Sequence, residues 1–293
     1  MREYVNVRAS ETLDQDELVA FLKSRFPRIT RPVGGRSPKG TECVEVRVPS
    51  NSPELEEIRR FIAARREQGL HGYCKFSIGW YLRKYSEAEL EQAEALWLKD
   101  LPHFEPCGQE CGTIYETLCR ECNWGRQVSD LILDLRRAPQ HKDISETIAR
   151  VEWVVSSNFV RIFSENKFTG AEFRPIFEFK NPTKQSTEWR QLWVTGNAGG
   201  LAEQTRLGKD PFNPMPVAWR CPLGHSIVTQ FQSEIYLHRD EWEGSDISVT
   251  GALFGQGGGL VRPIPLIVIS QRIYRMIKQA GLKGFTYEIA HLV

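Results

Sequence analysis

The strongest constraint on the fold is a segment that occurs twice in the C-terminal two-thirds of the chain. Residues 155–161 read Val-Ser-Ser-Asn-Phe-Val-Arg, and residues 269–275, located 114 positions later, read Ile-Ser-Gln-Arg-Ile-Tyr-Arg. The same spacing relates four further pairs of positions, which are Ser156 and Ser270, Arg161 and Arg275, Gly170 and Gly284, and Phe173 and Tyr287. Self-similarity at a constant spacing indicates one structural unit that is built twice.

A second match shows where the two copies differ. Residues 143–147, Asp-Ile-Ser-x-Thr, match residues 246–250 at a spacing of 103, which is 11 less than 114. The first copy therefore holds eleven additional residues in this region, which contains Cys119-Arg-Glu-Cys122. The spacing of 114 also relates Cys107 to Cys221 and Cys111 to His225.

Each copy carries the local signals of a strand, a capped helix, a turn and a closing strand. Ser156 and Ser270 are the expected N-caps of helices over 157–166 and 271–280, because a serine hydroxyl can accept a bond from a free N–H of the first turn. Gly170 and Gly284 supply the turns. These shared residues are explained by folding alone.

Residues 1–100 predict a small N-terminal domain in which strands and helices alternate. Ser52-Pro53 opens a helix over 54–67, and the capping box Ser86-x-x-Glu89 opens another that runs to about Trp97. The predicted class is α+β, with a small N-terminal α/β sandwich-like domain followed by two related α+β repeats. The predicted boundaries are 1–100 for the N-terminal domain, 101–182 for the first repeat, 183–217 for a loop-rich linker and 218–293 for the second repeat.

Four cysteines in the first repeat have the spacing of a metal site. Cys107-x3-Cys111 and Cys119-x2-Cys122 each place two sulfurs close enough to bind one ion, and Zn²⁺ prefers four such ligands in a tetrahedron. The residues between the two pairs can form a strand of a hairpin that brings the second pair back. We therefore predict a structural zinc ion, held in a zinc-ribbon-like knuckle by Cys107, Cys111, Cys119 and Cys122.

Other interpretations of the cysteines stay open. The pairs could be reactive or buried thiols, although a redox Cys-x2-Cys usually opens a helix, and iron–sulfur ligation is a further alternative. Cys221-x3-His225 is half of a site, which we interpret as a degenerate motif without a metal. His238 or His291 could complete it only if the fold brings them close.

Composition excludes some classes of protein. The 38 basic and 37 acidic residues give a net charge of +1, which argues against a strong electrostatic footprint for nucleic acid and leaves a local basic patch open. The first residues lack the apolar core of a signal peptide, and the most apolar stretch, residues 264–269, is too short to span a bilayer. With seven cysteines, an odd number, these features predict a cytoplasmic protein in a reducing compartment, without a membrane partner.

The cysteine pairs and the repeated closing segment together resemble the bacterial double-CXXCG-motif family. The residues that carry the resemblance are Cys107, Cys111-Gly112, Cys119, Cys122, and 266–270 with 281–285, and the similarity in architecture covers about residues 100–293. Members of this family are paralogous proteins of myxobacteria, some of them described as immunity proteins against toxins. The resemblance implies a protein partner, which for an immunity protein is a toxin.

Three functions follow as hypotheses. The first is a non-enzymatic zinc-binding protein that acts as a protein-interaction module of the immunity or adaptor type, because we find no catalytic Ser-His-Asp or His-Glu-x-x-His pattern. The second is a nucleic-acid-binding zinc-ribbon protein, suggested by the basic residues Arg120, Arg126, Arg136 and Arg137. The third is an enzyme with a site between the two repeats; a large pocket with converging polar residues would favour it.

Overall fold

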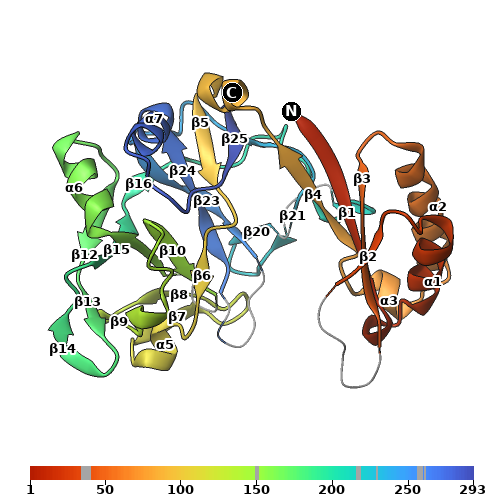
Figure 1. Ribbon diagram of the computed structural model, residues 1–293, viewed down its shortest axis with the longest axis horizontal. Helices are drawn as coiled ribbons and strands as arrows, with labels where there is room; N and C mark the ends of the chain where they lie inside the picture. Colours follow the sequence, from red (N-terminus) through yellow and green to blue (C-terminus); the bar gives the residue numbers. More distant parts are fainter. Residues whose placement is uncertain (34–40, 149–151, 216–218, 229, 256–259, 261) are drawn as a thin grey trace. The chain divides into compact units, whose positions relative to one another are not determined.

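The computed structural model describes residues 1–33, 41–148, 152–215, 219–228, 230–255, 260 and 262–293 (Figure 1). It has the mixed α+β character that the sequence predicts, with several sheets and shorter stretches of helix in the described ranges. Two compact units can be distinguished: unit 1 comprises Met1–Ser86, Arg206–Val217 and Gln230–Ser233, and unit 2 comprises Glu87–Thr205, Ala218–Thr229 and Glu234–Val293. Unit 1 therefore includes two segments that the sequence analysis assigned to the linker and the second repeat.

Unit 1 contains a four-stranded sheet against which two long helices pack. The strand order is β2 (Thr30–Pro32), β3 (Cys43–Pro49), β1 (Arg2–Ser10) and β4 (Gly79–Lys84). The helices of the unit are α1 (Asp16–Arg25), α2 (Pro53–Glu67) and α3 (His71–Cys74). Valines of β1 and β3 alternate in burial and form one core with Leu22 of α1 and Ile58 of α2. The predicted cap of α2 is confirmed, since Ser52 Oγ accepts from Leu55 N at 3.3 Å.

A buried aspartate holds the inserted segments within unit 1. Residues 206–215 and 230–231 form a small sheet with the order β18 (Asn213–Met215), β17 (Leu207–Asp210) and β21 (Gln230–Phe231). The Asp210 side chain is fully buried and forms an ion pair with Arg66 of α2 at 2.7 Å. It also accepts hydrogen bonds from the backbone N–H groups of Ile78 and Phe212. These bonds compensate the desolvation of a carboxylate that is removed from water.

The described residues of unit 2 form two large sheets and two small ones. The larger sheet has the order β19 (Trp219–Arg220), β20 (Ser226–Val228), β23 (Ile247–Phe254), β24 (Ile264–Ser270), β5 (Ala95–Leu98), β25 (Tyr287–Leu292) and β22 (Ile235–Leu237), with β16 (Gly196–Asn197) also paired to β23. The five-stranded sheet has the order β12 (Ala171–Arg174), β15 (Trp189–Val194), β11 (Trp153–Ser156), β10 (Ile144–Thr147) and β6 (His103–Phe104). The small sheets are β14 (Asn181–Gln185), β13 (Ile176–Glu178) and β9 (Leu131–Leu133), and the hairpin of β7 (Tyr115–Cys119) and β8 (Trp124–Gln127). The helices are α4 (Glu87–Gln92), α5 (Gly108–Cys111), α6 (Ser157–Glu165) and α7 (Gln271–Gln279).

Corresponding parts of the two large sheets have the same register. In one sheet β15 lies between β11 and β12, and in the other β5 lies between β24 and β25. Ser156 and Phe173 are opposite Trp189 and Leu192. In the same way, Ser270 and Tyr287 are opposite Ala95 and Leu98. Ser156 and Ser270, like Phe173 and Tyr287, are 114 positions apart in the sequence. Their partners on β15 and β5 are also separated by a constant distance in sequence, which is 94 positions in both cases (189−95 and 192−98).

Hydrogen bonds also link the segment of β11 and α6 to the segment of β24 and α7, in the same way in both directions. Ser156 and Ser270 cap α6 and α7 as predicted, and their hydroxyl groups donate to Asp143 and Asp246 at 2.7 and 2.9 Å. The second oxygen of Asp143 accepts from Lys283 N, in the turn after α7. The second oxygen of Asp246 accepts from Thr169 N, in the turn after α6. Each aspartate thus fixes its own serine and the turn of the other segment.

Two expected elements differ from the structure. The helix expected to reach Trp97 ends at Gln92, and residues 95–98 form β5, a buried strand in the middle of the larger sheet. The segment 183–217 was expected to be a loop-rich linker, yet it contains β15, which pairs with both β11 and β12. In both cases apolar side chains of the segment, such as Leu96 and Leu192, are buried in the core of unit 2, and this burial outweighs the local propensity. No helix in the described ranges combines the length and apolar character needed to cross a membrane.

Candidate metal centre

The first two candidate ligands are at the end of a β-hairpin. Cys119 is the last residue of β7, and Cys122 is in the turn that leads to β8. Asn123 completes this turn with a φ of 59°, a left-handed conformation that asparagine adopts more readily than most residues. The tight turn allows two sulfurs separated by only two residues to point toward the same point.

The other two candidate ligands are in a turn about 100 positions later. The backbone N–H of Cys221 donates a hydrogen bond to the carbonyl oxygen of His225 at 3.0 Å. The backbone N–H of Gly224 donates to the carbonyl oxygen of Cys221 at 2.8 Å. Gly224 has a φ of 88°, which glycine adopts without steric penalty. This turn connects β19 to β20, and β20 pairs with β23 in the larger sheet of unit 2.

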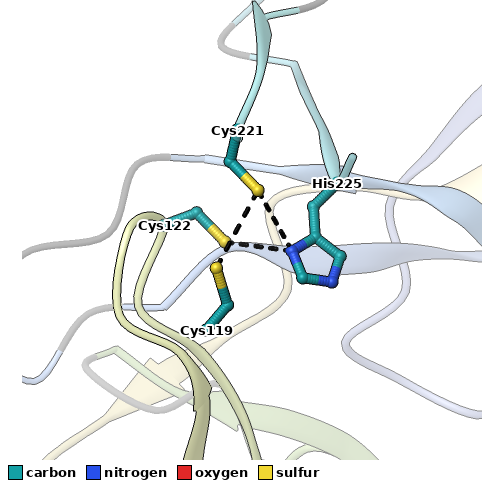
Figure 2. Close-up of side chains that lie close together, drawn as sticks. All are labelled: Cys119, Cys122, Cys221 and His225. Carbon is teal, nitrogen blue, oxygen red and sulfur yellow. Dashed lines mark hydrogen bonds between the residues drawn. The ribbon is translucent and has the colours of Figure 1, made fainter. Parts of the chain in front are cut away.

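The fold brings the two turns together, as Figure 2 shows. Cys119 Sγ is 3.8 Å from Cys221 Sγ, and His225 Nδ1 is 3.6 Å from Cys122 Sγ and 3.2 Å from Cys221 Sγ. All four ligand atoms are within 4.8 Å of one another. A zinc tetrahedron with bonds of about 2.3 Å to sulfur and 2.0 Å to nitrogen has edges of roughly 3.8 Å between sulfurs and roughly 3.5 Å between sulfur and nitrogen. The observed separations are close to these values and much too long for a disulfide.

The surroundings of the cluster are apolar. The three cysteines are buried, and their side chains pack with Ile227 and Leu253. The Trp124 ring lies 4.8 Å from the His225 ring, centroid to centroid. A low-dielectric environment strengthens the attraction between thiolates and a cation, and it limits the access of water to the ligands.

Backbone N–H groups supply part of the electrostatics. The Cys122 N–H bonds to the Cys119 thiolate and lowers the pKa of Cys119 to about 7, with further contributions from the side chains of Cys122 and His225. Burial raises the pKa of the Cys122 thiol to about 11. One thiol of the turn is therefore readily ionised, and a bound cation would be required to ionise the other near neutral pH.

The predicted ligand set of four cysteines is divided by the structure. Cys119 and Cys122 belong to the cluster, whereas Cys107 and Cys111 do not. The physical reason is the length of β7, because five residues of extended chain carry Cys119 roughly 15 Å along the hairpin. Burial raises the pKa of Cys107 to about 11 and also raises that of Cys111, which favours neutral thiols at this position.

Cys107 and Cys111 instead form the two ends of a short helical turn. Cys107 is the N-cap of α5, and its backbone N–H donates to Glu110 at 3.0 Å. Gly108 N donates to Glu152, a buried carboxylate that also accepts from Tyr115 and Thr147. This pair is therefore next to a buried carboxylate, which disfavours thiolate formation.

Two candidate ligands of this cluster were not part of the sequence prediction. Cys221 and His225 were interpreted as a remnant without a metal, because the spacing of 114 aligned them with Cys107 and Cys111. The signal that could have identified them is chemical: Cys-x2-Cys and Cys-x3-His are each one half of a common zinc ligand set, whatever the distance between them. His291 makes no part of the cluster, since its Nε2 lies 2.8 Å from Glu234, and His238 is not among the grouped ligands either.

No model of a known protein family matches this chain, and no curated protein sequence matches it either.

Proposed function

We propose that Cys119, Cys122, Cys221 and His225 bind one structural Zn²⁺ ion in a protein-interaction module without enzymatic activity. The observation that carries the proposal is the convergence of three buried thiols and one imidazole nitrogen within 4.8 Å. Three sulfurs and one nitrogen form a complete tetrahedral set of the kind found in structural zinc sites. Cadmium and iron also bind thiolate ligands, so elemental analysis must identify the metal.

The metal would act as a crosslink between distant segments. The 119–122 turn is at the tip of a two-stranded hairpin, and the 221–225 turn belongs to the edge of the larger sheet. A two-stranded hairpin is marginally stable by itself. A shared ion would therefore fix the β7–β8 hairpin on the rest of unit 2 and contribute on the order of 10 kcal/mol to local folding.

The metal assignment is tested by elemental analysis and by replacement with Co²⁺. We expect about one zinc ion per chain, and a cobalt spectrum with thiolate charge-transfer bands typical of a tetrahedral site with several sulfurs. Cys221→Ser and His225→Ala should lose the ion, as should Cys119→Ser. Cys107→Ser is the matched control and should retain it. Loss of metal in Cys107→Ser, with retention in Cys221→Ser, would restore the ligand set expected from the sequence.

Apolar residues beside the ligands support a protein partner. Leu223, within the 221–225 turn, is 65% exposed, and Leu118, next to Cys119, is 39% exposed. Ile114 and Val128, at the other end of the β7–β8 hairpin, are also exposed. Exposed large apolar side chains on a metal-fixed hairpin suit the contact surface of a protein of the immunity or adaptor class.

A pull-down from the source organism tests the interaction. Zinc-loaded protein should retain a partner that Leu118→Ser/Leu223→Ser loses, although this double variant should keep its zinc. Capture of the same proteins by both forms would contradict the proposed surface.

Nucleic-acid binding is less well supported by the charges. Two of the arginines that suggested it are in ion pairs, Arg126 with Glu116 and Arg136 with Asp134. Binding to nucleic acid should weaken steeply as salt increases. A gel-shift series at low and high salt would reveal this behaviour if it existed.

The shared register of the two large sheets supports the two related α+β repeats expected from the sequence. We infer that residues 101–182 and 218–293 derive from one ancestral unit, and that β5 and β15 are equivalent strands. Deletion of residues 95–98 should then disrupt the larger sheet as severely as deletion of 189–192 disrupts the five-stranded one.

A further inference from the structure

Unit 2 contains a second feature that the metal centre does not use, a cavity of about 880 Å³. Its walls come from the end of β5 and the following loop, from β6, β10 and β11, and from β24. Aromatic and apolar side chains form much of the lining, among them Trp97, Trp153 and Phe285. A volume of this size is within the range of pockets that bind small organic molecules.

Three side chains of this lining are cross-strand neighbours. In the five-stranded sheet, Glu146 of β10 is opposite His103 of β6 on one side and Trp153 of β11 on the other. Residues directly opposite each other on neighbouring strands have side chains on the same face. All three line the cavity, so a carboxyl group occupies the centre of a row flanked by an imidazole and an indole.

The environment of Glu146 disfavours an isolated negative charge. Removal from water is the main reason why the pKa of Glu146 is raised to about 7 from its ordinary value of 4.5. A hydrogen bond from the Trp153 side chain lowers this pKa, and the negative charge of Asp100 raises it further. A ligand that brings a positive charge to this position would reverse that penalty. The tryptophan rings favour the same charge, because the face of an indole attracts cations.

Two of the cations in the lining already have partners. Lys99 forms an ion pair with Glu288 and lies over the Trp97 ring. Arg262 donates toward Glu116 O and the Thr117 hydroxyl of β7. These contacts direct two of the three positive charges of the lining to protein groups, the third being Lys142, whereas Glu146 and Asp100 are the carboxylates that line the cavity within the described residues.

We propose that this cavity binds a small organic cation with a flat aromatic body, whose N–H groups donate to Glu146 and whose ring packs against Trp153. Amidinium, guanidinium and protonated aryl-amine groups have this chemistry. The proposal is independent of the zinc assignment, because none of the four ligands lines the cavity. It assigns binding to the site and no reaction.

Benzamidine is a suitable probe, and benzoate is the matched control of opposite charge. We expect benzamidine to bind the full-length, zinc-loaded protein in calorimetry, with saturable quenching of tryptophan fluorescence, and benzoate not to bind. Glu146→Gln should weaken benzamidine binding about tenfold or more, because a charge-assisted hydrogen bond is lost. Glu165→Gln, a change at an exposed residue of α6, should leave it unchanged.

A pH series on the wild-type protein supplies a second measurement that needs no variant. Benzamidine affinity should rise between about pH 6 and pH 8 as Glu146 ionises, since the probe remains cationic in this range. The other titratable or charged groups of the lining are Lys99, Asp100, His103, His141, Lys142 and Arg262. The Glu146→Gln variant separates the contribution of Glu146 from that of these groups, and it should flatten most of the pH dependence.

Several results would overturn the proposal. They are absence of benzamidine binding at millimolar concentration, equal binding of benzoate, equal affinity in Glu146→Gln, or a wild-type affinity that does not change with pH. If Glu146→Gln fails to fold, the wild-type charge preference and pH series decide the question alone.

Discussion

The sulfur atoms of Cys119 and Cys221 lie 3.8 Å apart although 102 positions separate the two residues. This distance matches the edge of a zinc tetrahedron, and the proposed shared ion would close a long loop through unit 2. Removal of the metal by a chelator should therefore lower the melting temperature of the wild-type protein markedly. Cys107→Ser should show the same fall, whereas Cys119→Ser should melt low with or without chelator. Differential scanning calorimetry with and without EDTA measures this, and a chelator effect that persists in Cys119→Ser would contradict the assignment.

Asp246 connects the cap of α7 to the turn after α6, and its loss should be costly. The residue is 3% exposed and accepts from Ser270 Oγ, Thr169 N and the Arg272 guanidinium. Asp246→Ala leaves these donors without an acceptor and should reduce the free energy of unfolding by about 3 kcal/mol. Asp143→Ala should have a smaller effect, because Asp143 is only half-buried. Urea unfolding of the two variants makes the comparison; equal losses would show that burial does not control the difference.

Gly170 is in a turn where no side chain can be accommodated. Its φ is 88°, and a Cβ at this position would lie 1.9 Å from the carbonyl oxygen of Ile247. Gly170→Ala should therefore destabilise the protein by more than about 2 kcal/mol, since a backbone group must move in addition to the left-handed penalty. Gly281→Ala is the matched control. Gly281 has a φ of 64° with open space around it, and its substitution should destabilise by only about 1 kcal/mol. Thermal melts of the two variants would refute this prediction if they coincided.

Loss of one partner of the Arg66–Asp210 ion pair should lower the stability of unit 1 more than loss of both partners. Arg66→Met leaves the fully buried Asp210 carboxylate without its cation and should destabilise unit 1 by about 3–5 kcal/mol. The double variant Arg66→Met/Asp210→Asn removes both charges and should recover part of this loss. Hydrogen exchange of amides in β17 and β4 reports the local stability. A double variant less stable than Arg66→Met would show that the charge itself is not the cause.

Glu146 predicts a pH dependence of stability with a definite sign. Because the pKa of Glu146 in the folded protein, about 7, is above its ordinary value of 4.5, the folded state binds the proton more tightly than the unfolded state. The stability that the folded state gains from this proton is fully present below about pH 4.5 and is lost as pH rises through 7. Glu146→Gln should therefore gain stability relative to wild type at about pH 8, by at most about 3 kcal/mol, and little at about pH 5. Denaturant titrations at the two pH values test the sign.

Local sequence was sufficient for the capped helices. Ser52, Ser156 and Ser270 each accept from an N–H three residues later, a contact that depends on neighbouring residues alone. The internal match at a spacing of 114 likewise led to Gly170 and Gly284, which occupy equivalent turns with positive φ. The chain also contained the information that Cys-x2-Cys and Cys-x3-His are zinc-type half-sites.

Tertiary structure alone decided which half-sites meet. Cys119 and Cys122 are closer in sequence to Cys107 and Cys111, but the extended strand β7 separates those pairs, and long-range pairing in the larger sheet brings the 221–225 turn to them instead. Long-range strand pairing also decides the structure of residues 95–98. Their local pattern favours a helix, but they form a strand because they pair with β24 and β25. The cavity beside Glu146 likewise depends on strands from both large sheets of unit 2. Spacing along a chain predicts contacts within a turn or a helix, whereas contacts between distant segments depend on the burial and strand pairing of the whole unit.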